Sequence, residues 1–330
     1  MKQVKDKTIF SGIQPSGTLH IGNYLGAIKQ WVELQHNNTA FFCIVDEHAI
    51  TAPYDEKKLP NAILDAAATY LATGIDSENS TIFVQSHVTA HTQLAWLLAS
   101  NTPLGELNRM TQYKEKSAKQ KNEGTLGLFA YPVLQAADIL LYQTNIVPVG
   151  EDQIQHIELT RDIAKRFNNL FDKTFTIPRP LINKDTARLM SLTNPTQKMS
   201  KSDNPKSYIA LTDKPEVIKQ KIMSAVTETE PVFSFTKSGP AVKNLLTIYQ
   251  AFSEEKQEEI ELEFKKDGYK EFKEALVNLL VDKLTPIQEK YEELRKDEPK
   301  LRKLLDNGAK QANRIANKTL TDVKEKMGLL

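Results

Sequence analysis

The sequence is poor in cysteine, since Cys43 is the only one among 330 residues. A single thiol excludes a disulfide within the chain, and it also excludes a zinc site built from several cysteines. Cys43 stands inside the apolar run FFCIV, which predicts a buried core thiol. A chain without disulfides is typical of a reducing compartment, so we expect a cytoplasmic protein.

Long hydrophobic runs and an excess of charge are also absent. No run approaches the ~18 apolar residues of a membrane span, and no apolar segment follows the charged N-terminus as in a signal peptide. We therefore expect no membrane partner. The 43 basic and 42 acidic residues leave a net charge of +1, which excludes a uniformly basic nucleic-acid coat. Local basic patches remain compatible with nucleic-acid binding.

What is present in the first half is an alternation of short β-rich runs with amphipathic segments. The predicted strands are 8–12, 40–46, 81–86 and 146–150, and the predicted helices are 19–34, 57–73, 91–100, 131–142 and the segment from 151. Gly74 follows one helix as a C-terminal cap. This rhythm predicts an α/β protein with a Rossmann-like, doubly wound parallel sheet. Ligands of such sheets bind beyond the carboxyl ends of the strands, where the loops 12–18 and 46–51 fall.

The second half has a different composition, which suggests a second domain. Strand signals fade beyond residue 207, and residues 214–330 are mostly helical and rich in lysine and glutamate. A length of 330 residues also fits two domains. We expect a catalytic domain over 1–206, with a helical insertion around 103–145, and an all-helical domain over 207–330.

The stretch GIQPSGTLHIGNYLG, residues 12–26, favours phosphate binding. A helix N-terminus after a loop offers unpaired backbone N–H groups and the positive end of a dipole. His20 falls in the first turn, where it can donate to a phosphate oxygen, and Gly22 allows a flat group to approach the backbone. The stretch is neither a Walker loop nor a GxGxxG motif. A glycine turn with a surface histidine is the alternative interpretation.

The stretch PTQKMSKSDNPKSY, residues 195–208, carries Lys198 and Lys201 three positions apart. A flexible ammonium group suits phosphate, and two of them on one loop can stabilise a charged transition state. An exposed basic loop is the alternative, because paired lysines at this spacing are common.

Together these stretches resemble the signatures of class I aminoacyl-tRNA synthetases. His20–Asn23 is similar to the HIGH motif, with Asn23 in place of the last histidine, and residues 198–202 match KMSKS. Further strings resemble bacterial tryptophanyl-tRNA synthetases over nearly the whole chain: SGIQPSG, IVDEHAIT, YPVLQAADILLY, VPVGEDQ, TARLMSL and NRIANKTL. Gln135 departs from that pattern, since many bacterial members carry methionine there and tyrosyl enzymes often carry glutamine.

The resemblance implies a two-step reaction. L-Tryptophan attacks the α-phosphate of ATP, which brings Mg²⁺ as a substrate metal with no dedicated protein metal site. The tryptophanyl group then passes to the 3′ end of tRNA(Trp). Because a carboxylate is already a nucleophile, catalysis would consist of positioning and charge stabilisation. The resemblance also implies a homodimer, and contact between the helical region 207–330 and the anticodon.

The resemblance further implies the roles of individual residues. Catalysis would depend on His20, Lys198 and Lys201, with Lys116 of the charged 113–125 loop as a weaker candidate. ATP would be bound by Gln14, Pro15, Ser16, Gly22, Asn23, Gly150, Glu151, Asp152, Leu189, Lys198, Met199, Ser200, Lys201 and Ser202. A helix-capping role is the alternative for the carboxylates of the 150–153 turn.

Asp138 is the most informative residue of the expected amino-acid site. A carboxylate inside the apolar helix 131–142 is costly unless it is paired, so it either bonds neighbouring structure or accepts the indole N–H of tryptophan. The full set expected around tryptophan is Phe10, Gly12, Gln14, His48, Tyr131, Gln135, Asp138, Val147, Val149 and Gln153. Core packing is an equally good interpretation of Phe10 and the two valines.

Three other functions remain open on the sequence. Gln135 raises a tyrosyl-tRNA synthetase of the same class. The nucleotide loop alone would also suit an HxGH nucleotidyltransferase acting on a small acid, although that enzyme would not need the long helical region. A synthetase-like module that only binds tryptophan or tRNA is the third alternative.

Overall fold

The structure is a computed structural model that describes residues 4–15, 17, 19–111, 124–182, 188–200 and 204–330. Its strands are β1 (Thr8–Ile13), β2 (Thr39–Ile44), β3 (Ser80–Val84), β4 (Ile146–Pro148) and β5 (Arg179–Leu181). The helices before β4 are α1 (Ile21–Asn23), η1 (Tyr24–Ile28), α2 (Lys29–Leu34), η2 (Gln35–Asn37), α3 (Asp46–Ala49), α4 (Leu59–Ala72), η3 (Gln85–His87), α5 (Ala90–Ala99), α6 (Leu104–Asn108) and α8 (Leu126–Leu140). Those after β4 are η4 (Glu151–Gln153), α9 (Ile154–Phe171), η5 (Pro205–Ser207), α10 (Pro215–Met223), α11 (Pro240–Ser253), α12 (Gln257–Glu263), α13 (Tyr269–Lys296) and α14 (Glu298–Lys326).

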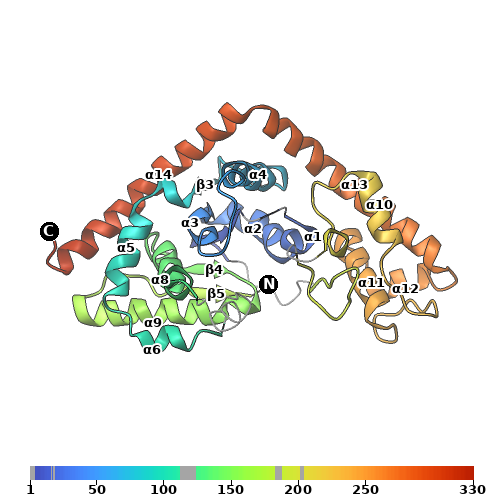
Figure 1. Cartoon of the computed structure of the whole chain (residues 1–330), viewed down its shortest axis with the longest axis horizontal. Coiled ribbons are helices and arrows are strands. Elements are labelled where there is room, and N and C mark those ends of the chain that lie inside the picture. The colour runs from blue at the N-terminus through green and yellow to red at the C-terminus, as the bar shows by residue number, and fades with distance from the viewer. Residues whose placement is uncertain (1–3, 16, 18, 112–123, 183–187, 201–203) are drawn as a thin grey trace. The chain divides into compact units, whose positions relative to one another are not determined.

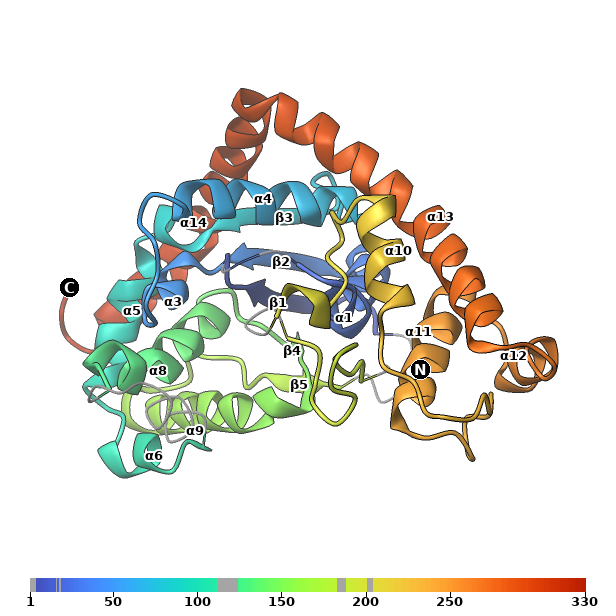
Figure 2. The ribbon, with the colours of Figure 1, turned by 45° about the vertical axis from the view of Figure 1, so that its right-hand side comes forward.

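The five strands form one parallel sheet with the order β3-β2-β1-β4-β5 (Figure 2). The predicted α/β fold with a doubly wound parallel sheet is confirmed. The strand order reverses between β1 and β4, which places the expected ligand site at their carboxyl ends. The sequence did not predict β5, which has only three residues, one of them Pro180. No helix within the described ranges combines the length and apolarity needed to cross a membrane.

The central strands are buried on both faces, and successive side chains alternate between two cores. On β2, Phe41 and Cys43 join a cluster with residues of α5, α8 and α9. Phe42 instead stacks on Trp31 of α2, with ring centroids 5.1 Å apart. Cys43 is fully buried, as predicted, and burial raises the pKa of its thiol. The continuous apolar run of β2 therefore reflects a strand between two layers of helices.

The helix predicted over 19–34 forms with an irregularity in its middle. Ile21, Leu25 and Ile28, at steps of four and three, are buried, while Val32 at the next step is half-buried. Residues 24–28 widen into a π-helical turn, in which the N–H of Lys29 bonds the carbonyl of Tyr24. Such turns are rare and occur mostly as short insertions in α-helices. Hydrophobic spacing alone did not predict this turn.

Gly74 ends α4 as predicted. Its φ of +105° is in the left-handed region that favours glycine, and the N–H of Ile75 reaches back to the carbonyl of Tyr70 at 3.0 Å. This turn directs the chain from α4 toward β3.

The contacts divide the chain into two units, each described here by itself. The first unit comprises Met1–Ser16, Gln30–Asn183 and Asp297–Leu330, and the second comprises Gly17–Lys29 and Lys184–Lys296. This division differs from the expected boundary at residue 206. The reason is that the chain returns to the first unit at its end, where α14 packs against β3, α5 and α4 (Figure 1). The helices α6 and α8 of the expected 103–145 insertion also belong to the first unit.

The packing of α14 on the edge strand β3 requires a glycine. A Cβ atom on Gly308 would lie 1.9 Å from the carbonyl oxygen of Ile82. Small residues follow on the same helix at Ala309, Ala312 and Ala316, all buried. Further along, Asn313 Nδ2 donates to the carbonyl of His87 at 3.0 Å. The helix thus lies directly on the backbone of β3 and covers an edge that would otherwise be exposed.

We predict that Gly308→Ala lowers the thermal midpoint of unfolding. Alanine favours a helix by ~1 kcal/mol over glycine, but overpacking against backbone costs about 1–3 kcal/mol or more. Gly105→Ala is the matched control, because α6 is also helical there and a Cβ would meet nothing within 4 Å. Calorimetry of both variants should show a loss for Gly308→Ala alone. Equal midpoints would mean that α14 does not need this close approach.

Candidate active site

Polar groups cross-link the carboxyl ends of β2 and β3. Asp46 Oδ1 accepts from the backbone N–H of Ser86 at 3.0 Å, and Asp46 Oδ2 accepts from the Ser86 hydroxyl at 2.6 Å. The N–H of Glu47 donates to the side-chain oxygen of Gln85 at 3.1 Å. These bonds fix the short helices α3 and η3 at the edge where doubly wound sheets bind ligands.

Helix α8 presents three of the predicted residues on one face. Tyr131, Gln135 and Asp138 stand at steps of four and three, so they follow one another along the same side of the helix. Tyr131 and Asp138 are buried, and Gln135 is half-buried. The sequence-predicted set around tryptophan therefore includes one continuous helical stripe.

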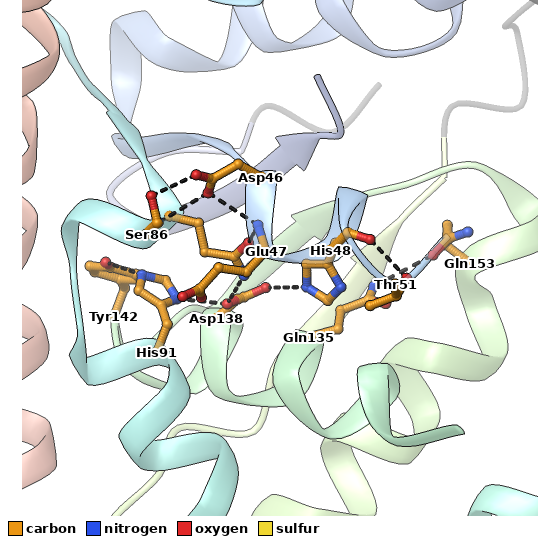
Figure 3. Close-up of polar contacts among 11 residues, drawn as sticks. Asp46, Glu47, His48, Thr51, Ser86, His91, Gln135, Asp138, Tyr142 and Gln153 are labelled. Carbon is orange, nitrogen blue, oxygen red and sulfur yellow. Dashed lines mark hydrogen bonds and ion pairs between the residues drawn. The ribbon is translucent and has the colours of Figure 1, made fainter. Parts of the chain in front are cut away.

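The carboxylate of Asp138 is the centre of a buried network (Figure 3). His48 Nε2 lies 2.7 Å from Oδ2, while His91 Nδ1 and Gln85 Nε2 lie 2.6 and 2.8 Å from Oδ1. All four residues are at most 6% exposed. The hypothesis that Asp138 bonds neighbouring structure is thus correct, and the network also reaches the predicted residue His48.

The electrostatics of the network favour an ionised Asp138. Burial by itself raises the pKa of the Asp138 carboxyl, but the attraction and hydrogen bonds of His48 and His91 outweigh burial and hold the pKa well below its usual range. An ionised carboxylate can only accept hydrogen bonds. His48 Nε2 and His91 Nδ1 therefore both carry the hydrogen.

Tyr142 closes the far end of the network. Its hydroxyl lies 2.9 Å from His91 Nε2, and burial raises the pKa of this phenol, so the hydroxyl keeps its hydrogen. The ring stacks on Phe41 at 4.5 Å and on Phe10 at 5.5 Å between centroids. Aromatic side chains of the sheet thus fix the position of Tyr142 beneath His91.

A half-buried rim adjoins this network. The rings of His48 and Tyr131 meet edge to face with centroids 6.2 Å apart, and the Tyr131 hydroxyl lies 2.8 Å from His156 Nε2. Burial raises the pKa of Tyr131 to about 12. Gln135 Nε2 and Gln153 Oε1 stand 3.5 Å apart. The α8 stripe is thereby joined to the turn after β4, which includes Gly150, Glu151 and Asp152.

The predicted apolar residues lie close to the core. Phe10 and Val147 belong to the hydrophobic cluster, and the half-buried Val149 packs against it. Gly12, at the end of β1, has a packing reason for its missing side chain. A Cβ there would stand 2.9 Å from the carbonyl oxygen of Cys43. Gln14 and Pro15 follow directly after β1.

In the second unit, His20 caps the helix that follows it. His20 Nδ1 accepts from the N–H of Gly22 at 3.1 Å, and Asn23 Oδ1 accepts from the N–H of His20 at 3.1 Å. A neutral ring in this arrangement carries its hydrogen on Nε2. His20 is 6% exposed, which differs from a surface histidine. A Cβ on Gly22 would fall 2.9 Å from the His20 ring, so this glycine serves the fold of the cap.

The lysine stretch of the second unit is attached to a buried asparagine. Met199 donates its N–H to the carbonyl of Leu189 at 3.0 Å, and Lys198 pairs with Met190 in an antiparallel bridge. Asn244 of α11 bonds both backbone groups of Met190, at 2.8 and 2.9 Å. The chain continues from this bridge at Lys198 through Met199 to Ser200.

Four of the predicted residues lie outside the described residues, namely Ser16, Lys116, Lys201 and Ser202. The other residues expected to bind ATP are divided between the units. Gln14, Pro15, Gly150, Glu151 and Asp152 belong to the first, and His20, Gly22, Asn23, Leu189, Lys198, Met199 and Ser200 belong to the second. Among the residues that the structure describes, no group of three or more histidine, cysteine, aspartate or glutamate side chains is arranged to hold a metal ion.

The sequence analysis missed several residues of these sites. Gln85, His91, Tyr142 and Asn244 are all at most 4% exposed and bond the predicted residues or their neighbours. Each of them is a polar side chain within or next to an apolar segment of the sequence. Such a position indicates a buried polar group, and a buried polar group requires a hydrogen-bond partner. The identity of that partner could not be read from the sequence.

Comparison with known proteins is decisive at this point. The model of the tRNA synthetases class I (W and Y) matches residues 2–318 of the chain. The chain belongs to this family of class I synthetases. The α/β fold, the HIGH-like helix start and the KMSKS-like stretch of this synthetase agree with that membership.

The relatives of this class I synthetase extend over its whole length. The tryptophan–tRNA ligase of Bacillus anthracis is 54% identical over 323 residues, which covers 97% of this chain and 98% of the relative. The tryptophanyl-tRNA synthetase structure from Mycoplasma pneumoniae aligns with a TM-score of 0.88 at 38% identity, covering 98% of each chain. The Campylobacter jejuni structure, complexed with ADP and tryptophan, aligns with a TM-score of 0.87 at 39% identity, covering 98% and 100%.

The lowered pKa of Asp138 predicts a pH dependence of stability. A carboxyl with a depressed folded pKa stabilises the fold above its unfolded pKa of about 3.9, and this contribution is lost as pH falls through the folded value. We expect Asp138→Asn to lower the free energy of unfolding by roughly 1–3 kcal/mol at pH 7. The difference from the parent should shrink below about pH 4, as measured by urea unfolding. A difference that stays constant down to pH 3 would contradict this.

Proposed function

We propose that this class I synthetase is a tryptophan–tRNA ligase that works through an adenylate. A carboxylate oxygen of L-tryptophan attacks the α-phosphorus of ATP and pyrophosphate leaves. A hydroxyl of the terminal tRNA ribose then attacks the carbonyl carbon of the adenylate and AMP leaves. The chain supplies binding and charge stabilisation, since neither step needs a covalent bond to the enzyme.

The observation that carries the choice of amino acid is the buried anionic Asp138. Its carboxylate lies at the edge of the sheet where ligands bind, on the same helical face as Tyr131 and Gln135. We propose that Oδ2 accepts the indole N–H. The half-buried Gln135 points its amide nitrogen toward Gln153, at the rim of the site. The buried acceptor proposed for the indole N–H is therefore the Asp138 carboxylate, which Gln85 also contacts. Phenylalanine cannot satisfy that acceptor, which favours strong rejection of it.

The capped helix start and the lysine stretch of the second unit support the nucleotide role. His20 presents Nε2 as its N–H group, and Lys198 contributes a flexible cation at the end of a short bridge. We propose that they contact the phosphates of ATP, with Mg²⁺ arriving on the nucleotide as part of the substrate. The Campylobacter relative, complexed with ADP and tryptophan, supports this pair of ligands.

The remaining partners belong to the same proposal. We propose tRNA(Trp) as the acceptor of the tryptophanyl group, with the helical region after residue 207 as its anticodon contact. A homodimer and a cytoplasmic setting also stay predictions. The full-length similarity to tryptophan–tRNA ligases supports tRNA as the acceptor. It favours this proposal over a nucleotidyltransferase or a non-enzymatic binding module.

Amino-acid-dependent exchange of pyrophosphate into ATP tests the substrate. We expect exchange with tryptophan and none above background with tyrosine or phenylalanine. Exchange with tyrosine would make Gln135 the informative residue and the proposed substrate wrong. A folded sample without exchange for any of the three would contradict activation altogether.

We predict that Lys198→Ala slows activation about 10²–10³-fold, as expected for loss of a group that stabilises developing charge. Tryptophan affinity, measured by equilibrium binding, should stay unchanged. Lys206→Ala is the matched control, because it removes an exposed lysine from the same segment. Equal losses of rate and tryptophan affinity in Lys198→Ala would contradict a role in the transition state.

A further inference from the structure

We propose that His91 is a positioning residue for amino-acid selection, because it orients Asp138 so that one oxygen is reserved for the indole N–H. The proposal rests on the tryptophan site proposed above. It concerns the elements behind that site, α5 and η3, which would not touch the substrate.

The carboxylate of Asp138 has a limited number of acceptor positions. Each oxygen of a carboxylate offers about two lone-pair positions. Oδ1 is filled by two donors, His91 Nδ1 at 2.6 Å and Gln85 Nε2 at 2.8 Å. Oδ2 receives one donor, His48 Nε2 at 2.7 Å. Among the residues that the structure describes, these three donors leave one position, and it is on Oδ2.

His91 removes one of the positions at which the carboxylate could accept. With His91 present, the unfilled position is on Oδ2, and three donors hold the plane of the carboxylate. Without His91, Gln85 and His48 would supply one donor each, so each oxygen would have an unfilled position and the plane would be held less firmly. A single N–H donor of the substrate would then meet a carboxylate without a fixed direction.

His91 itself is held from behind. It is 0% exposed, and its second nitrogen bonds the hydroxyl of Tyr142. Whether the Tyr142 hydroxyl donates to Nε2 or accepts from it, His91 keeps a hydrogen on Nδ1 that faces Asp138. This order leaves no acceptor facing another acceptor along the chain Tyr142, His91, Asp138 (Figure 3). Outer partners of this kind fix both the ring orientation and the position of its hydrogen, as they do for histidines that bind metals.

The test compares ligands with and without the N–H. L-Tryptophan carries the indole N–H, and L-3-(3-benzothienyl)alanine has sulfur in its place. The KM and kcat of pyrophosphate exchange are measured for tryptophan, and the inhibition constant is measured for the benzothienyl analogue. The proteins are the parent chain and the variants His91→Leu, His91→Asn, Leu94→Ala and Asp138→Asn.

His91→Leu should raise the KM for tryptophan about 10- to 100-fold, with little change in kcat. This is the size of effect seen when a residue that hydrogen-bonds a metal ligand is removed. The inhibition constant of the analogue should stay unchanged. His91→Asn should recover most of the loss, because the asparagine amide can place a donor where Nδ1 stands. Leu94→Ala truncates a fully buried core residue on the same helix and controls for lost stability. It should not alter the ratio between the two ligands.

Each other outcome has a definite meaning. If His91→Leu weakens both ligands equally, as a damaged core would, the positioning role is overturned. If His91→Asn behaves like His91→Leu, the donor to Oδ1 is not what matters, and the proposal fails. If Asp138→Asn leaves the ratio between the ligands unchanged, the proposed tryptophan site itself is wrong, which distinguishes that failure from the failure of His91.

Discussion

The burial of one ionised carboxylate constrains most of the first unit. Removing a charge from water costs several kcal/mol unless hydrogen bonds replace the lost hydration. For Asp138 the replacement donors come from α3, η3 and α5, while the carboxylate itself is on α8. These elements must therefore meet within hydrogen-bond distance, and a small displacement of any one of them would leave a buried charge short of donors. The positions of these four elements are therefore fixed by the need of the Asp138 carboxylate for its three donors.

In the second unit, backbone pairing holds the two motif stretches. His20 pairs with Ala210, and Lys198 pairs with Met190. Ser207 accepts from the N–H of Leu192, which ties the segment of the lysine stretch to the segment that pairs with His20. The HIGH-like and KMSKS-like stretches are thus both attached to residues 207–211, although 178 positions separate His20 from Lys198 in the sequence. Neither stretch would have a defined shape as an isolated peptide.

Much of the fold could be predicted because its signals are local. Apolar runs located the four strands β1 to β4, and Gly74 marked the end of α4. The strand β5 was missed because three residues carry no periodicity. The division by contacts differs from the expected boundary near 206 because composition distinguishes helical from mixed segments but does not reveal what a helix packs against.

The candidate site divides in the same way between local and distant information. The cost of a carboxylate in an apolar helix singled out Asp138 in advance. Its partner His91 is 47 positions away, and Gln85 is 53 positions away, so only the assembled sheet brings them together. Gly22 was predicted to admit a ligand, and the structure adds a packing reason for it, since a Cβ there would meet the His20 ring. A sequence can show that a group needs a partner without showing which residue supplies it.

The return of α14 to β3 also has a consequence for synthesis. Asn313 and the carbonyl of His87, which it bonds, are 226 positions apart, so this contact can form only after the ribosome has added Asn313. Until then the nascent protein carries β3 as an uncovered sheet edge, the kind of surface that pairs with other strands. A chain that terminates early, anywhere before α14, would keep that edge permanently. Exposure of β3 to other strands in such chains thus follows from the long separation between this strand and its covering helix.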